Sequence, residues 1–156
     1  MTSVVLDYKA SVPSNTFGGN PAVNIPQIPT QLQLADLGMF LPEITPSSES
    51  NRVFLFADVG ISSQLGSFFN NAVIFRIYRD GVEIFNTTVG LQNTPPASPP
   101  HDYNVTFNTI DEGVPFGFHV YQLTAQALIA NTAPMVFTIA QVVGPVTFSG
   151  LALGTV

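Results

Sequence analysis

The chain has 156 residues, a length typical of one domain, and a net charge of −6 at pH 7. Charged residues make up only 9% of it, against about 25% in an average globular chain. Four basic residues are too few for the cationic face that nucleic acid or an anionic membrane requires, so neither is an expected partner. The chain has no cysteine, which excludes disulfides, zinc–thiolate sites and cysteine nucleophiles.

The shortage of charge also bears on association. Hydrophobic residues make up 46% of the chain, and 13 of them are Phe. A small monomer usually keeps about 25–35% of its surface charged in order to stay dispersed. The composition therefore predicts that much of the surface is buried against other copies, as in a protein that assembles.

Residues 1–15 lack the basic stretch, the long apolar run and the small-residue cleavage site of a secretory signal. No run of 18 apolar residues is present, so we expect no transmembrane helix. We expect a protein that stays in the cell that makes it, or that reaches an outer surface by lysis or by assembly inside a surrounding compartment.

The N-terminal part is predicted to form two segments. Residues 2–8 are apolar and suited to an extended strand. Residues 11–30 contain residues that exclude a helix or a central strand, namely Pro13, Gly18, Gly19, Pro21, Pro26 and Pro29. We therefore predict a connector arm and Pro/Gly linker over residues 1–30, with a hinge at Gly18 and Gly19.

Residues 31–156 are predicted to form the domain body. Alternating apolar and polar residues, abundant Val, Ile, Thr and Phe, and frequent Pro and Gly favour strands over helices. The expected strands are 31–41, 52–61, 72–79, 82–85, 103–110, 117–129, 134–142 and 145–153. Loops are expected at 42–50 and 91–101, and a turn at 111–115. This pattern is typical of an all-β fold, either a β-sandwich or a jelly roll.

One hairpin is marked clearly. Asp80-Gly81 separates two alternating runs, and this pair favours a type I′ turn, in which both residues have positive φ. Arg76 and Arg79 precede the turn and Glu83 follows it. We interpret these charges, with Asp80, as a cross-strand cluster that fixes the hairpin register. The alternative places Arg76 in a contact between subunits.

Candidates for catalysis or metal binding are few. His101 and His119 lie eighteen residues apart, whereas cupin jelly rolls bind metal with two histidines two residues apart on one strand. We therefore predict no metal site and a structural role for His119. Ser149 lacks the glycine that a nucleophile elbow needs at the position of Thr147. No phosphate loop or dinucleotide fingerprint is present, so we expect no catalytic residues, no cofactor and no enzyme activity.

Five stretches together are similar to one family: residues 52–61, 73–81, 83–87, 117–124 and 144–152. They include an Arg-Asp-Gly hairpin, a His-x-Tyr-x-Leu-Thr strand and a Gly-Pro-Val-x-Phe-Ser-Gly-Leu-Ala ending. These motifs resemble the spore-surface branch of the C1q/TNF-like jelly rolls, which includes exosporium trimers and subunits of thin endospore appendages in Bacillus-like bacteria. The resemblance covers about residues 31–156.

The resemblance implies a C1q/TNF-like jelly roll that forms a homotrimer, has no enzyme activity and is deposited on the spore surface without a secretory signal. It also implies a spore-surface anchor protein and a tip protein as partners. Two features depart from better-known relatives, because the chain lacks both cross-linking cysteines and a collagen-like Gly-X-Y stalk. The thin fibrillar appendage type, with an N-terminal connector between trimers, fits best.

We therefore expect a structural subunit of an extracellular filament, in which trimers are joined head to tail by the N-terminal arm. Apolar side chains from strands 52–61, 117–129 or 145–153 are expected at the three-fold axis. The arm is expected to pair with a sheet edge on the next trimer, and a head-to-tail contact that does not close gives an open filament. Its anchors would be Val4, Val5, Leu6 and Tyr8. The alternative for the arm is to fold back on its own domain.

Two other functions are open at this point. One is a trimeric receptor- or glycan-binding head of the tail-fibre or lectin-like kind, which an exposed Tyr or aromatic cluster in a groove at the trimer apex would favour. The other is a cupin-like enzyme, which the histidine spacing disfavours.

Overall fold

The computed structural model describes residues 2–18, 21–63, 71–91, 100–129 and 140–156. Most of these residues belong to strands, and the one helical element among them is a single 3-10 turn at Ser48–Ser50. The strands are β1 (Ser3–Ser14), β2 (Val23–Asn24), β3 (Leu32–Leu41), β4 (Arg52–Ser63), β5 (Asn71–Arg79), β6 (Val82–Leu91), β7 (Asp102–Glu112), β8 (Gly117–Ile129) and β9 (Ala140–Thr155). Within the described ranges, no helix is long and apolar enough to cross a membrane.

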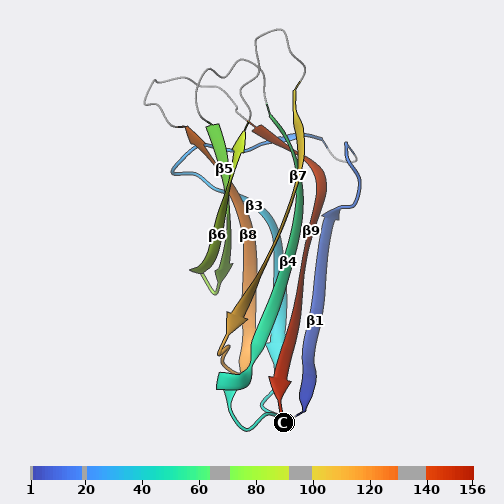
Figure 1. Ribbon diagram of the computed structural model, residues 1–156, viewed down its shortest axis with the longest axis vertical. Helices are drawn as coiled ribbons and strands as arrows, with labels where there is room; N and C mark the ends of the chain where they lie inside the picture. Colours follow the sequence, from blue (N-terminus) through green and yellow to red (C-terminus); the bar gives the residue numbers. More distant parts are fainter. Residues whose placement is uncertain (1, 19–20, 64–70, 92–99, 130–139) are drawn as a thin grey trace.

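Two antiparallel sheets pack face to face along the long axis of the molecule (Figure 1). We call them sheet A, with the order β1-β9-β4-β7, and sheet B, with the order β3-β8-β5-β6. The short strand β2 extends sheet A by pairing with β9. When β2 is set aside, the eight long strands follow jelly-roll connectivity, because the chain crosses repeatedly between the two sheets. The fold is therefore an all-β jelly-roll sandwich, as the sequence predicted.

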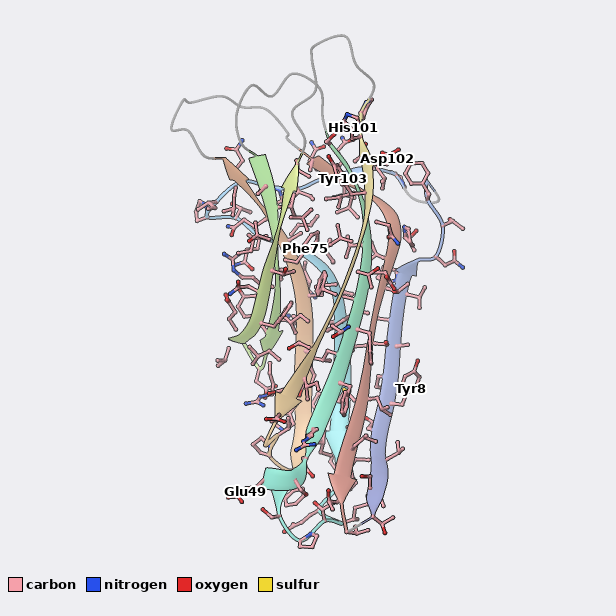
Figure 2. The ribbon with its side chains drawn as sticks, in the orientation of Figure 1. Tyr8, Glu49, Phe75, His101, Asp102 and Tyr103 are labelled. Atoms are coloured by element: carbon pink, nitrogen blue, oxygen red, sulfur yellow. The ribbon has the colours of Figure 1, made fainter. Side chains whose placement is uncertain are left out.

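The core lies between the sheets and follows the period-2 alternation of the strands. On β4, the side chains of Val53, Leu55, Ala57, Val59 and Ile61 are at most 1% exposed. Those of β5 and β8 interleave with them from sheet B: Val73, Phe75, Ile77, Tyr121, Leu123, Ala125 and Ala127. Figure 2 shows Phe75 between the two layers, where its ring lies 5.4 Å from that of Phe107.

The hairpin predicted at Asp80-Gly81 is confirmed. Asp80 has φ 51° and Gly81 has φ 83°, the two positive values that a type I′ turn needs. Arg79 pairs with Val82 directly across the turn. Strand β6 continues to Leu91, well beyond the predicted end at residue 85.

The C-terminal strand differs from the prediction. Residues 140–155 form one strand, β9, where the sequence indicated two strands, 134–142 and 145–153; residues 134–139 lie outside the described residues. Gly144 (φ 84°) and Pro145 do not end the strand, because they occupy a register shift opposite Gly60. A Cβ on Gly60 would lie 1.8 Å from the Gly144 carbonyl oxygen, so only glycine fits there.

The N-terminal segment also differs from the prediction. The sequence separated residues 1–30 from the jelly roll, but β1 is an edge strand of sheet A and pairs with β9 of its own chain. Farther along, Ile25 is 2% exposed, its amide donates to the Ala140 carbonyl of sheet A, and the Pro26 carbonyl accepts from Ala127 of sheet B. This stretch closes the side of the sandwich. Proline is tolerated here because an edge strand and a crossing segment need fewer ladder hydrogen bonds than a central strand.

Candidate association surface

The outer face of sheet A carries an uninterrupted row of apolar side chains. The strand registers place Tyr8 of β1 opposite Leu151 of β9, Leu151 opposite Phe54 of β4, and Phe54 opposite Ile110 of β7. These side chains alternate with the buried ones and therefore point away from the core. Tyr8 is 59% exposed and Ile110 is 49% exposed, and Figure 2 shows Tyr8 directed away from the sandwich.

Neighbouring rows extend this surface. Val5 lies opposite Leu153, and Phe56 lies opposite Ser149. Val5 is 64% exposed and Phe56 is 49% exposed. We define the sheet A patch as the apolar residues of these rows: Val5, Tyr8, Phe54, Phe56, Ile110, Leu151 and Leu153.

Charged and polar groups border the sheet A patch at both ends. At one end Arg52 forms an ion pair with Glu112, its register partner (Nε to Oε1, 3.4 Å). At the other end Asp58 accepts hydrogen bonds from the hydroxyls of Thr106 (2.5 Å) and Thr147 (3.2 Å). The patch is thus an uncharged centre with a polar rim, which is the usual anatomy of a protein–protein interface.

Strand β1 supplies one side of the patch, and Asp7 holds that strand in place. Asp7 lies at a register shift between β1 and β9. Its Oδ2 accepts from the backbone N–H of Phe40 on β3 (2.9 Å), and its Oδ1 accepts from the N–H of Tyr8 (2.8 Å). Asp7 therefore ties the edge of sheet A to the edge of sheet B. The alternation of apolar and polar residues along the sequence did not predict this role of Asp7, because Asp7 interrupts that alternation.

The four predicted connector residues divide between the two sides of β1. Leu6 packs against the core and Val4 is half-buried, whereas Val5 and Tyr8 point outward into the sheet A patch. The predicted hinge does not lie in a free linker, since the Gly18 N–H donates to the Val143 carbonyl on β9 (2.8 Å). Gly19 lies outside the described residues. Whether these residues connect successive trimers stays a prediction.

The outer face of sheet B has the opposite character over much of its area. Gln31 receives a hydrogen bond from Thr124 (2.9 Å) and donates one to the Tyr78 hydroxyl (2.9 Å). Arg76 donates to Gln126 (2.6 Å), and Gln126 donates in turn to the Thr30 carbonyl (3.1 Å). We call these side chains the sheet B network: Gln31, Arg76, Tyr78, Thr124 and Gln126. Its polar groups are largely satisfied within the chain.

Sheet B also carries a small aromatic pair. Phe40 (55% exposed) lies opposite Phe118 (64% exposed) on the outer face of β3 and β8. The Phe118 ring lies over Gly38, since a Cβ there would be 2.7 Å from the ring. This pair is much smaller than the sheet A patch.

The predicted arginine cluster is confirmed for Arg76, which pairs with Glu83 across the hairpin (Nε to Oε2, 3.1 Å). Arg79 instead spans the two sheets and makes a two-pronged contact with Asp111 of β7 (2.9 and 2.7 Å). Asp111 also accepts from the Tyr121 hydroxyl (2.8 Å). Burial, and then the neighbouring Asp111 carboxylate, raise the pKa of Tyr121 far above its ordinary value, so Tyr121 acts as a hydrogen-bond donor.

The two histidines lie near opposite ends of the long axis. His101 is near the start of β7, as Figure 2 shows, and its amide donates to the Ser63 hydroxyl (3.0 Å). His119 is near the start of β8 and contacts Asp80 and Pro115. In the described parts of the chain, no three His, Asp or Glu side chains gather as a metal site would need.

A groove of about 140 Å³ lies where β9, β2 and the start of β3 meet. Its lining is mainly aliphatic and includes Pro13, Val23, Leu32, Leu34, Val142 and Val146. None of the described residues that line it is aromatic. The aromatic cluster expected of a glycan-binding head was placed at the apex of a trimer, so that alternative stays a prediction.

No family model and no curated protein matches the chain. Among solved structures it is similar to a protein of the T13 IBDV viral particle, at 8% identity with a TM-score of 0.58. That alignment covers 96% of this chain and 35% of the other. It is also similar to VP2 of the infectious bursal disease virus subviral particle, at 10% identity with a TM-score of 0.52, over 94% of this chain and 32% of that one.

The chain thus spans about a third of the length of the viral proteins that it matches. At identities this low the likeness concerns the fold alone, and it agrees with the two-sheet topology of Figure 1. The chain is an all-β jelly-roll protein.

Proposed function

We propose that this chain is a structural subunit that forms a homotrimer through the sheet A patch and a filament through strand β1. One observation carries the proposal: an uncharged apolar row, from Tyr8 to Ile110, crosses all four long strands of an outer sheet face. Contiguous exposed apolar surface of this kind marks interaction sites in soluble proteins. The C1q/TNF-like family and a spore-surface location are proposed on the sequence resemblance described above.

The sheet A patch is suited to a cyclic assembly. In a three-fold ring each copy presents two different surfaces, because the contacts are heterologous. The β1–β9 side of the patch, with Val5 and Tyr8, packs against the β4–β7 side of the next copy, with Phe56 and Ile110. Apolar surface buried in these contacts contributes roughly 25 cal/mol per Å² to the free energy of association, before the entropic cost of association is subtracted.

Strand β1 is suited to exchange between copies. Its backbone pairs with β9 from Ser3 to Ser14, but only Leu6 packs against the core. The hydrogen bonds that hold it are therefore mostly main-chain bonds, which the same strand of another copy makes equally well. Such an exchange is β-augmentation by an identical element, and it joins trimers without any new contact.

The absence of native cysteine permits a direct test. Ala10 and Ser149 are register partners on β1 and β9. Their expected Cα separation, about 4.5–5.5 Å in an antiparallel pair, suits a disulfide. Oxidised Ala10→Cys/Ser149→Cys protein from assembled material is expected to run as a ladder of linked chains on a denaturing gel. The control is Ile74→Cys/Thr88→Cys, a register pair within the tight β5–β6 hairpin, which stays monomeric.

Two results would contradict the proposal. A full-length chain that stays monomeric at every concentration, by light scattering, would refute association through the sheet A patch. If oxidised Ala10→Cys/Ser149→Cys protein is linked only within single chains, strand exchange is refuted. The trimer is tested separately, by the mass that light scattering measures.

A further inference from the structure

His119 is fixed by two acceptors at the base of the β5–β6 hairpin. It lies on the core-facing side of β8, where it is 8% exposed. Its Nδ1 lies 2.6 Å from Asp80 Oδ2 in the hairpin turn, and its Nε2 lies 2.9 Å from the Pro115 carbonyl oxygen in the β7–β8 turn. One imidazole therefore joins the hairpin turn, the start of β8 and the turn before it.

Each acceptor requires a proton on the ring nitrogen that it faces. A neutral imidazole carries one N–H, whereas the imidazolium carries two. The Pro115 carbonyl can only accept, so Nε2 must donate. If Nδ1 then lacked its proton, its lone pair would face the Asp80 carboxylate at 2.6 Å. Only the doubly protonated ring satisfies both contacts.

Asp80 is arranged to remain ionised. Its Oδ1 accepts from the backbone N–H of Val120 (2.8 Å), and its own N–H donates to the Val120 carbonyl (2.9 Å). Burial opposes ionisation of Asp80, but the hydrogen bonds from His119 and from Val120, together with the charges of His119 and Arg79, lower its pKa below the ordinary value. The proton of the pair therefore belongs to the imidazole.

The other groups around the pair come from four elements. Strand β5 contributes Arg79, whose charge is balanced by Asp111 of β7. Strand β8 contributes Tyr121, a donor to Asp111. Strand β3 contributes Met39, the register partner of His119. Arg79 bonds to Asp111 and acts on Asp80 only through its charge, whereas the Asp80 carboxylate is in direct contact with His119.

We propose that His119 is a pH-sensitive latch: as the imidazolium it clamps the β5–β6 hairpin to the base of β8, and loss of its proton releases the clamp. The imidazolium donates to both acceptors, whereas the neutral ring has only one N–H, so loss of a proton at higher pH removes one of the two contacts. Asp80 has the opposite sign. Its lowered pKa stabilises the fold above the ordinary carboxyl range, and that contribution is lost as the pH falls through its titration.

The chain offers a matched control, because His101 is its other histidine. We expect the urea midpoint of the full chain, at one fixed protein concentration, to fall between about pH 5.5 and pH 8.5, on either side of the usual histidine range. The fall is expected in the wild type and in His101→Gln. It should be lost in His119→Gln and in Asp80→Asn, which replaces the Asp-Gly pair by Asn-Gly, a pair that a type I′ turn also favours.

A second measurement does not depend on any variant of the latch. With ¹⁵N-labelled histidine, His119 of the wild-type chain is expected to show two ring N–H signals near neutral pH, and His101→Gln assigns them. A single ring N–H on His119 would overturn the proposal. Equal pH dependence in His119→Gln and His101→Gln would overturn it as well.

Discussion

The outer faces of the two sheets differ in whether their side chains find partners within the same chain. On sheet B, Thr124 donates a hydrogen bond to Gln31. Gln126 accepts from Arg76 and donates to the Thr30 carbonyl. On sheet A, Phe54 and Tyr8 lie in a row that no other part of the described chain covers. Both faces follow the same two-residue alternation, so the backbone does not distinguish them. The difference teaches that, apart from Phe40 and Phe118, the face of sheet B is largely satisfied within one chain, whereas the sheet A patch would be covered only in the assembly that we propose.

The largest effect is expected from a charge at the centre of the sheet A patch. Phe54→Glu buries an unpaired carboxylate if copies associate through this face, at a cost of several kcal/mol. Association should weaken at least ~100-fold, which corresponds to about 3 kcal/mol. The fold itself should persist, because Phe54 lies outside the core between the sheets.

The matched control for that variant is Thr88→Glu on exposed strand β6, which adds the same charge to the other sheet. Light scattering over a concentration series measures both variants. Equal weakening by the two variants would mean that net charge, and not the sheet A patch, controls association.

The next effect belongs to the polar face. Gln126 is 3% exposed and bridges Arg76 and the Thr30 carbonyl. Gln126→Leu removes one hydrogen bond from a charged group and one to a carbonyl, which costs roughly 1–3 kcal/mol of unfolding free energy, although Arg76 keeps its ion pair with Glu83. The oligomer mass should not change. A variant that dissociates while its urea midpoint is unaffected would reverse the roles that we assign to the two faces.

A smaller effect is expected at the boundary between the faces. Asp7→Ala removes the hydrogen bond to the Phe40 amide that holds β1 against sheet B. We expect a loss of about 1–2 kcal/mol and faster hydrogen exchange confined to β1 and its partner β9. Because β1 supplies Val5 and Tyr8 to the patch, association should weaken in step. Lys9→Ala, which removes only an exposed ion pair with Asp7 at 3.6 Å, is the control and should change little.

The strands of the body were predictable because their alternation is regular and Asp80-Gly81 marks a turn. The choice of face was not predictable for β4. Its odd residues (Val53, Leu55) and even residues (Phe54, Phe56) are all apolar, so the hydrophobic pattern alone does not show which set is buried. Strand β1 was missed as part of the jelly roll because it offers the core little beyond Leu6 and is followed by proline.

Contacts between residues far apart in the sequence could not be predicted, for a different reason. Arg79 was assigned to the hairpin charges next to it, but it bonds to Asp111, 32 residues away. Local spacing cannot show which strand of the facing sheet lies opposite a side chain. Similarly, Gly144-Pro145 reads as a strand end, and only the close approach of Gly60 shows that it is a register shift within one strand.

The smallest effect is expected from Tyr78, the tyrosine of the sheet B network. Tyr78→Phe keeps the ring and removes the hydroxyl that accepts from Gln31 (2.9 Å). Gln31 keeps its bond from Thr124, and its freed amide is exposed and can be hydrated. The cost should therefore be no more than about 0.5–1 kcal/mol of unfolding free energy, with no change in oligomer mass. Tyr8→Phe on sheet A is the matched change, and it should also leave the mass unaltered because the apolar ring remains. Tyr8→Ser, which removes the ring, should weaken association, whereas Tyr78→Ser should not; light scattering of these four variants compares the two faces residue for residue.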